Sequence, residues 1–168
     1  EPRPELDALL HKVPMIRRST WRAPKGVYLY GNVGTGKTML MDMFIDTLCK
    51  FPNYASSSIR RTHFHRFMLD VHQRIHLLRQ EGHRGDLVTS VARQLVQEAP
   101  ILCFDEFQVT DVADAMILQR LFSIIYSHGG VVFATSNRAP LELYRVRGRG
   151  GLNYDLFLPF IDLLKERC

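Results

Sequence analysis

Residues 31–38 read Gly-Asn-Val-Gly-Thr-Gly-Lys-Thr, which matches the phosphate-loop pattern G-x-x-x-x-G-K-[ST] at every fixed position. Glycines in such a loop let backbone N–H groups turn toward a polyphosphate, and a helix beginning near Lys37 adds the positive end of its dipole. Lys37 would neutralise the β and γ phosphates of a nucleotide, while the Thr38 hydroxyl would complete a Mg²⁺ shell. The predicted nucleotide-binding residues are Gly31, Asn32, Val33, Gly34, Thr35, Gly36, Lys37 and Thr38.

An acidic pair, Asp105 and Glu106, directly follows the apolar run Ile-Leu-Cys-Phe at 101–104. Four apolar residues before acids suggest a strand buried on both faces, and ligands of an open α/β sheet gather at the carboxyl ends of its strands. Asp105 is expected to hold Mg²⁺ through its water shell, and Glu106 to orient and deprotonate the attacking water. A pure nucleotide-binding switch would not need Glu106, so its presence favours hydrolysis.

A third polar group, Thr135, Ser136 and Asn137, closes the next apolar strand. In a parallel sheet this end faces the same crevice as Asp105, so Asn137 can hydrogen-bond the γ phosphate or the attacking water as a sensor. The alternative is an ordinary helix-entry turn, which Ser-Asn-Arg-Ala-Pro would also suit. The order of elements favours the sensor, which makes Lys37, Glu106 and Asn137 the predicted catalytic residues.

Alternating strands and helices must position these side chains. The predicted strands are 26–30, 59–65, 101–104 and 131–136, and the predicted helices are 37–50, 69–82, 87–98 and 112–127. This alternation implies right-handed crossovers and an α/β fold with a parallel sheet that helices cover on both sides. Residues 1–24 read as an N-terminal lead-in, and residues 25–168 as the core domain.

The histidines suggest a metal site, because His63 and His65 share a face of the predicted strand and His72 and His76 share a helix face. The helical pair lacks the carboxylate that a zinc peptidase requires between them, so packing or subunit contacts are favoured. After the same strand come Phe67 and Met68. They pack in the core or line the central pore of a ring-forming motor, and both interpretations stay open.

Composition indicates one globular domain, with 168 residues, 46% of them apolar and 23% charged. The net charge of +5 permits a nucleic-acid partner without indicating one. The cysteines, Cys49, Cys103 and Cys168, lie too far apart for a disulfide framework or a zinc cluster, which favours a reducing compartment. No apolar stretch approaches the length of a transmembrane helix.

Four segments carry a family resemblance: 63–72, 102–118, 135–140 and 157–161. Together with the phosphate loop they resemble the AAA+ branch of P-loop ATPases, and more narrowly the ATPase-family-gene-one-like, or lactation-elevated, proteins, whose bacterial relative is ZapE. The resemblance implies a three-layer P-loop NTPase sandwich with strand order 1-4-3-2 in this chain. It also implies a fifth strand and a helical lid, with a sensor arginine, beyond Cys168.

The same resemblance implies hydrolysis of ATP with Mg²⁺ in a homo-oligomeric ring that acts on protein substrates. For a eukaryotic member it implies the mitochondrial inner membrane or matrix, with peripheral membrane association, and for a bacterial member the cytoplasm and an association with cell division. The alternative functions are a nucleic-acid-dependent ATPase or loader, suggested by the arginine-rich positive charge, and a nucleotide-binding adaptor with weak hydrolysis.

The chain departs from the family pattern at one position. The resemblance implies an arginine ahead of the Phe-Leu-Pro-Phe-Ile segment, acting as a finger into the neighbouring subunit's nucleotide, but Tyr154 stands there. A tyrosine cannot supply the positive charge, so Arg147 and Arg149 in the preceding loop are the candidates for it. An arginine finger is worth about 10³–10⁵ in rate, and the adaptor alternative rests on this departure.

Overall fold

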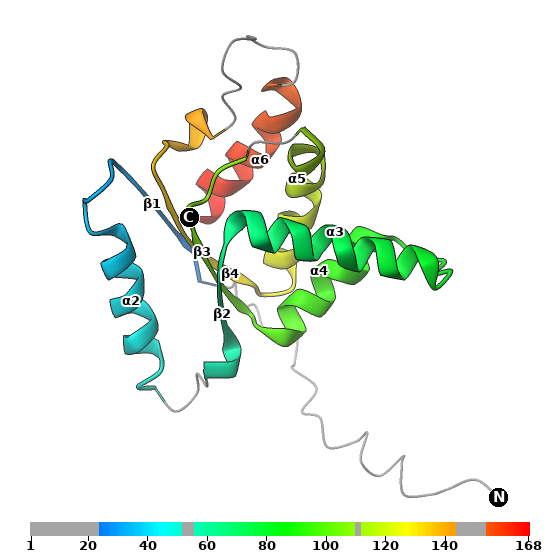
Figure 1. Cartoon of the computed structure of the whole chain (residues 1–168), viewed down its shortest axis with the longest axis horizontal. Coiled ribbons are helices and arrows are strands. Elements are labelled where there is room, and N and C mark those ends of the chain that lie inside the picture. Colours follow the sequence, from blue (N-terminus) through cyan, green and yellow to red (C-terminus); the bar gives the residue numbers. More distant parts are fainter. Residues whose placement is uncertain (1–23, 52–55, 110–111, 144–153) are drawn as a thin grey trace, which may run out of the picture.

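Four parallel strands form the centre of the fold (Figure 1). They are β1 (Val27–Tyr30), β2 (Ile59–His63), β3 (Ile101–Asp105) and β4 (Val131–Ser136), in the order β1-β4-β3-β2. The predicted order and parallel pairing are therefore confirmed. The structure is a computed structural model and describes residues 24–51, 56–109, 112–143 and 154–168, so most of the predicted lead-in lies outside the described residues.

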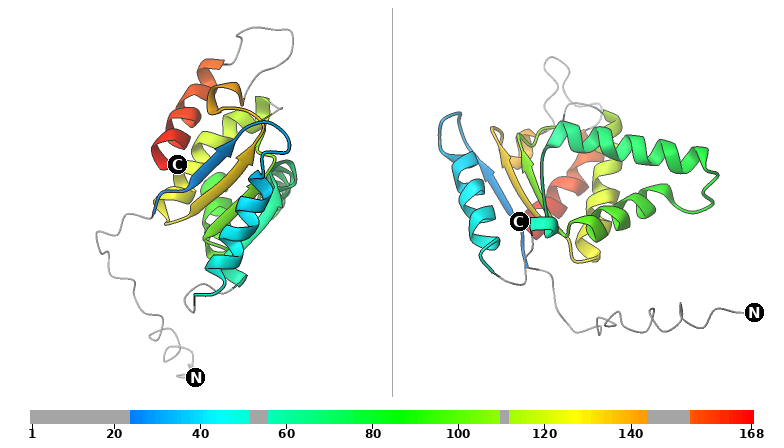
Figure 2. Two further views of the ribbon diagram at one scale, coloured as in Figure 1. Left: turned by 90° about the vertical axis from the view of Figure 1, so that its left-hand side faces the viewer. Right: turned by 60° about the horizontal axis from the view of Figure 1, so that its bottom comes forward.

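Helices cover both faces of this sheet, which gives the expected three-layer sandwich (Figures 1 and 2). On one face lies α2 (Lys37–Leu48), and on the other lie α3 (Phe64–Gln80), α4 (Leu87–Glu98), α5 (Val112–Ser127) and α6 (Tyr154–Arg167). Short 3₁₀ turns occupy Ser56–Ser58 and Pro140–Glu142. The positions of α2, α4 and α5 agree with the sequence prediction, although α2 ends at Leu48.

Strand β3 shows why the sheet needs helices on both faces. Leu102 and Phe104 pack in the larger hydrophobic cluster with α3 to α6, whereas Ile101 and Cys103 pack against Met41 of α2. Successive side chains of a strand point to opposite faces, so an unbroken apolar run fills both layers. The prediction that this strand is buried on both faces is confirmed.

The boundary between β2 and α3 differs from the prediction. Strand β2 ends at His63 and α3 already begins at Phe64, so His63 and His65 do not share a strand face. The helical side chains that bury themselves from this point are Phe64, Phe67, Met68 and Val71, each at most 1% exposed. Their i, i+3, i+4, i+7 spacing is that of one helix face, and its burial outweighs the short alternation that suggested a longer strand.

Phe67 and Met68 lie in the core, so the pore-loop interpretation is wrong. They are 0% and 1% exposed, respectively. The Phe67 ring centroid lies 4.7 Å from that of Phe104 and 6.2 Å from that of Phe64. Aromatic contacts of this kind stabilise a core beyond their buried area, which leaves neither side chain available to a pore.

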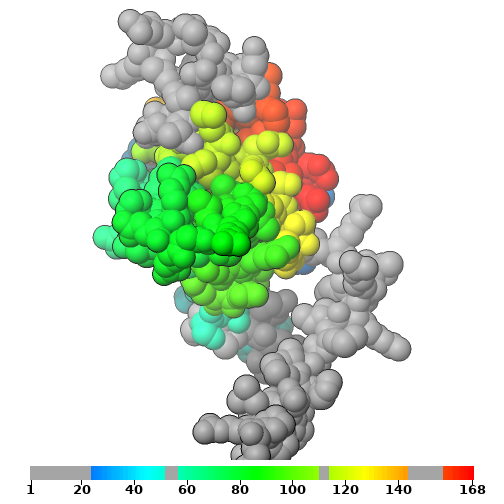
Figure 3. Space-filling model, turned by 90° about the vertical axis from the view of Figure 1, so that its right-hand side faces the viewer, coloured from blue at the N-terminus to red at the C-terminus, as the bar shows by residue number. Residues whose placement is uncertain are grey.

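The α3–α4 hairpin forms the front of the face shown in Figure 3, with α5 and α6 beside it. Arg60 of β2 pairs with Asp70 of α3, with Nη2 2.7 Å from Oδ2, which holds the hairpin to the sheet. Within the hairpin, Arg74 of α3 contacts both Asp70 and Glu98 of α4. Within the described residues, no helix has the length and apolar character needed to cross a membrane.

Candidate nucleotide-binding site

The phosphate loop bends around the start of α2. Gly34 and Gly36 have φ angles of 83° and 80°, in the left-handed region that favours glycine. Gly36 is also the N-cap of α2, and a glycine has no side chain that could accept from the first N–H groups of the helix. By contrast, the side chain of Asp86 caps α4, accepting from Thr89 N–H at 3.1 Å. The first N–H groups of α2 are therefore left for an anionic ligand.

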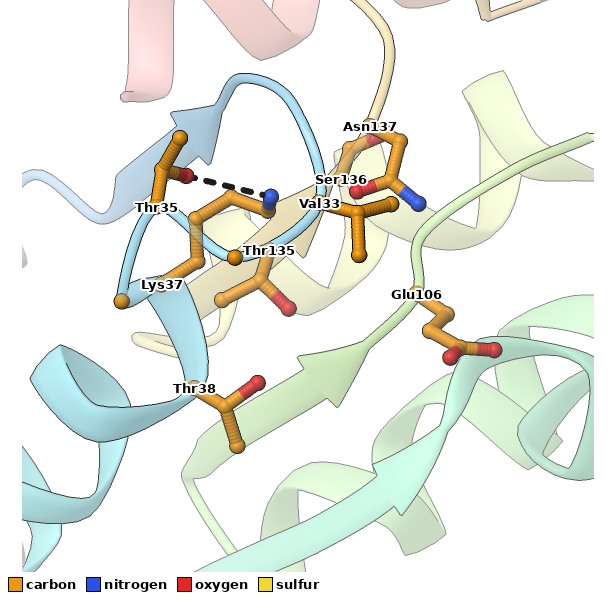
Figure 4. A pocket seen from close by; sticks show the side chains of 10 residues that line it. Val33, Thr35, Lys37, Thr38, Glu106, Thr135, Ser136 and Asn137 are labelled. Atoms are coloured by element: carbon orange, nitrogen blue, oxygen red, sulfur yellow. Dashed lines mark hydrogen bonds between the residues drawn. The ribbon is translucent and has the colours of Figure 1, made fainter.

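The Lys37 ammonium lies inside the loop. It donates to the carbonyl oxygens of Gly31 and Asn32 at 2.8 and 2.7 Å, and Thr35 Oγ1 lies 3.4 Å away (Figure 4). Gly31 and Asn32, predicted to contact the nucleotide, thus hold the lysine in place by their carbonyls. An ammonium group has no acceptor and donates in several directions, so Lys37 can also donate to a phosphate oxygen from this position.

A pocket of about 410 Å³ opens in front of this loop. Its lining residues come from three segments: Val33, Gly34, Thr35, Gly36, Lys37 and Thr38 from the loop and α2, Glu106 after β3, and Thr135, Ser136 and Asn137 at the end of β4. In the view of Figure 4, Glu106 lies on the opposite side from Lys37, and Asn137 lies between the two. The structure therefore brings together the three predicted catalytic residues, although they are far apart in the sequence.

Glu106 has a strained backbone, with a φ angle of 54°. It stands between the end of β3 and Phe107, whose side chain is fully buried and whose N–H donates to Thr135 O at 2.7 Å. The Phe107 ring centroid lies 3.9 Å from that of Phe64. The left-handed turn lets the chain place an exposed acid at the pocket and, one residue later, an aromatic ring in the core.

Hydrogen bonds join the loop after β3 to the loop after β4. The buried Ser136 hydroxyl donates to Phe107 O at 2.6 Å and accepts from Arg138 N–H at 3.1 Å. Arg138 O in turn accepts from the Tyr28 hydroxyl at 2.8 Å. Burial raises the pKa of Tyr28 to about 12, so the hydroxyl keeps its proton. Asn137 lies between these anchored residues, which fixes its backbone beside Glu106.

Asp105 lies next to the pocket but is not among its lining residues. Arg61 Nε donates to Asp105 Oδ2 at 2.7 Å, and the same guanidinium contacts Asp42 of α2. The hydrogen bond with Asp105, followed by that with Asp42, raises the pKa of Arg61 above its ordinary value. The metal role assigned to Asp105 stays a prediction, now with a cationic partner beside it.

A family model described as AFG1-like ATPase matches residues 1–168, the whole chain. The chain belongs to the AFG1-like ATPase family. Lactation elevated protein 1 homolog B of Danio rerio is 48% identical over 86% of the chain, and cell division protein ZapE of Escherichia coli strain K12 is 39% identical over 99% of it. The chain spans only 28% and 42% of these two relatives' own lengths.

Solved structures of other proteins share the fold of this AFG1-like chain. DnaI gives a TM-score of 0.59 at 13% identity, covering 100% of this chain and 80% of that one. Domain III of the Thermotoga maritima replication initiation protein DnaA gives 0.56 at 18% identity, covering 93% of this chain and 57% of that one. At such low identity these likenesses show the α/β P-loop NTPase architecture alone.

The residues of this AFG1-like chain fit a Mg²⁺ ion that a nucleotide would bring with it. Thr38 lines the pocket and Asp105 lies next to it, and a hydroxyl and a carboxylate are oxygen groups of the kind that bind Mg²⁺. Among the residues that the structure describes, no three His, Cys, Asp or Glu side chains gather to hold a metal by themselves. A hydroxyl with one carboxylate fits Mg²⁺, which commonly takes few carboxylates and several phosphate and water oxygens.

The histidines have other surroundings. His72 Nε2 lies 2.7 Å from Asp114 Oδ1, a contact that ties α3 to α5. His76, one turn further along α3, is exposed. His72 thus makes a contact between two helices of the chain, and for His76 the prediction of packing or subunit contacts stays a prediction.

The strained turn at Glu106 gives a test of the geometry in solution. Glu106→Ala is expected to be less stable than Glu106→Gly by about 1 kcal/mol, because an L-residue in the left-handed region costs roughly that amount and glycine does not. Both variants lack the carboxylate, so the comparison isolates the backbone. The free energy of unfolding in urea measures it, and a glycine variant less stable than the alanine variant would show that the turn is not left-handed in solution.

Proposed function

We propose that this chain is the nucleotide-binding core of an ATPase that hydrolyses ATP with Mg²⁺. The observation that carries the proposal is the pocket in which the phosphate loop, Glu106 and Asn137 meet. A loop for binding alone would not need an acid and an amide on the opposite side of the γ phosphate. The lining residues would surround the phosphate end of a bound nucleotide, and family membership is the reason for proposing ATP as that nucleotide.

Each side chain has a role that its position supports. Lys37 and the N–H groups at the start of α2 bind the phosphates, since both present positive charge to the pocket. Glu106 accepts the proton of the attacking water, and Asn137 orients that water or the γ phosphate. Mg²⁺, held by Thr38 and Asp105 with the phosphates, would supply charge neutralisation. In Figure 4 the Glu106 carboxylate points away from Lys37, and because the side chain is exposed it can rotate into the pocket.

The ring is the second part of the proposal. The pocket's described lining contains Lys37 as its single cationic side chain, so an arginine from a neighbouring subunit would complete the charge. Arg147 and Arg149, the candidates for this role, lie outside the described residues. At the position of Tyr154 the structure describes the first residue of α6.

We also propose that the whole protein handles protein substrates. A eukaryotic member would act in mitochondria, at the inner membrane or in the matrix, and a bacterial member in the cytoplasm. The support is family membership, together with the bacterial relative's name as a cell division protein. The fold likeness to DnaA and DnaI is no argument for a nucleic-acid substrate. Single-stranded DNA is therefore used in the experiment only to test the alternative function.

Turnover per subunit, measured in the full-length protein over a wide range of protein concentration, tests the ring. We expect the rate per subunit to rise as subunits meet, because an arginine supplied in trans acts only in the assembly. A nucleotide-binding adaptor would show weak turnover at every concentration, which would overturn the ring motor. Stimulation by single-stranded DNA that disappears at high salt would instead support the nucleic-acid-dependent ATPase.

A further inference from the structure

Arg61 bridges two acidic side chains from different layers of the sandwich. Its Nε donates to Asp105 Oδ2 at 2.7 Å and its Nη2 to Asp105 Oδ1 at 3.4 Å. Its Nη1 donates to Asp42 Oδ1 on α2. One guanidinium therefore connects the acid at the end of β3 to the helix that follows the phosphate loop.

The strand register explains why Arg61 reaches these acids and its neighbour Arg60 does not. In the parallel pairing of β2 with β3, Arg61 lies opposite Cys103 and Arg60 opposite Leu102. Cys103 faces α2 and Leu102 faces the other helices, so the two arginines emerge on opposite faces. Arg60 accordingly pairs with Asp70 of α3, at 2.7 Å.

The bridge lies beside Thr38 and includes Asp105, the two residues predicted to hold Mg²⁺. Asp42 follows Thr38 at i+4, one turn along the same face of α2. Arg61 thus fixes Asp105 relative to the turn of helix that carries the Thr38 hydroxyl. The closer contact engages Asp105 Oδ2, while Oδ1 is held only at 3.4 Å and keeps acceptor capacity for another donor.

The pairing is stronger than an ordinary surface ion pair. The Asp105 side chain is 14% exposed and that of Arg61 34%, so solvent screens this contact less than it would on an open surface. A guanidinium has a rigid planar fork and can contact both oxygens of one carboxylate and a further acceptor at once. A lysine keeps the charge but cannot hold both acids in one geometry.

We propose that Arg61 is a positioning residue for the metal end of this site, holding Asp105 where a Mg²⁺-bound nucleotide needs it. The inference rests on the proposed function, since it assigns a partner to the predicted metal residue. It differs from a direct catalytic role, because Arg61 is absent from the pocket lining and acts through Asp105. A residue that orients a metal ligand typically changes metal affinity about 10–100-fold when it is replaced.

The test measures equilibrium binding of a fluorescent, non-hydrolysable ATP analogue to the full-length protein as Mg²⁺ is titrated. In Arg61→Met, the Mg²⁺ concentration that half-maximally tightens analogue binding is expected to rise about tenfold. In Arg61→Lys this Mg²⁺ concentration is expected to rise clearly as well, because the planar guanidinium is lost although the charge remains. Arg60→Met is the matched control, because it removes an arginine of similar exposure from the adjacent position. Its half-maximal Mg²⁺ concentration should stay within about twofold of that of the wild type.

Other outcomes separate this inference from the proposed function. If Mg²⁺ does not change analogue binding to the wild-type protein, the metal-dependent function fails and the inference with it. The positioning role alone is overturned if the wild type responds to Mg²⁺ but Arg61→Met has the same half-maximal Mg²⁺ concentration. It is also overturned if Arg61→Lys has the wild-type concentration. If Arg61→Met does not fold, Asp42→Asn removes the ion pair between Arg61 and the half-exposed Asp42 of α2. An increase of about threefold or more in the half-maximal Mg²⁺ concentration would then support the bridge, and an unchanged concentration would overturn it.

Discussion

Glu106→Gln is expected to lower steady ATP hydrolysis by about 10²–10⁴-fold, while the protein still binds ATP. The amide keeps the size of the side chain and its place on the pocket wall, but it cannot accept the proton of the attacking water. Binding depends on the phosphate loop and the start of α2, which the substitution does not touch. The measurement is phosphate release by the full-length protein, followed by identification of the nucleotide that remains bound.

The control for this variant is Glu81→Gln, which removes the same charge from an exposed residue at the end of α3. Its hydrolysis rate should equal that of the wild type. We expect ATP to remain bound to Glu106→Gln and ADP to the wild type. Undiminished hydrolysis by Glu106→Gln would remove the general-base role from this residue.

Lys37→Met is expected to weaken ATP binding by about 100-fold or more. A hydrogen bond to a charged group contributes about 1.5–3 kcal/mol, and each 1.4 kcal/mol is about tenfold in affinity. Lys37 would make such bonds to more than one phosphate, because its ammonium already lies inside the loop at 2.8 Å from Gly31 O and 2.7 Å from Asn32 O. Titration with a fluorescent ATP analogue measures the change.

Lys50→Met supplies the comparison, since Lys50 is exposed just beyond the other end of α2. It loses the same charge far from the phosphates, and its affinity for the analogue should stay within about twofold of wild type. Equal affinities for Lys37→Met and wild type would place the nucleotide somewhere other than the phosphate loop. Equal losses in both lysine variants would indicate a general charge effect in place of a specific contact.

The sheet could be predicted because its signals are local. The buried run before Asp105 and the phosphate loop after β1 each mark the carboxyl end of a strand, and alternating helices require parallel crossovers. The end of β2 could not be placed in this way. Residues 59–65 alternate as a strand would, yet Phe64 begins a helix face that runs to Val71 and is buried throughout. Burial in three dimensions decided between two periodicities that overlap in the sequence.

The site also contains residues that local motifs predict and residues that only the folded structure reveals. Lys37, Glu106 and Asn137 follow from motifs at the ends of predicted elements, and the structure places them around one pocket. The roles of Arg61 and Ser136 depend on strand register and on contacts between segments far apart in the chain. For Arg61 the sequence contains one usable signal, because two adjacent arginines in a strand must point to opposite faces of the sheet.

Phosphate release from ATP by the full-length protein, compared with Mg²⁺ and with excess EDTA, is the most direct test of hydrolysis in this pocket. The expected result is steady release with Mg²⁺ that EDTA abolishes and that Lys37→Met and Glu106→Gln both lack. Release that persists in EDTA, or that is equal in wild type and Lys37→Met, would contradict Mg²⁺-dependent hydrolysis at the phosphate loop.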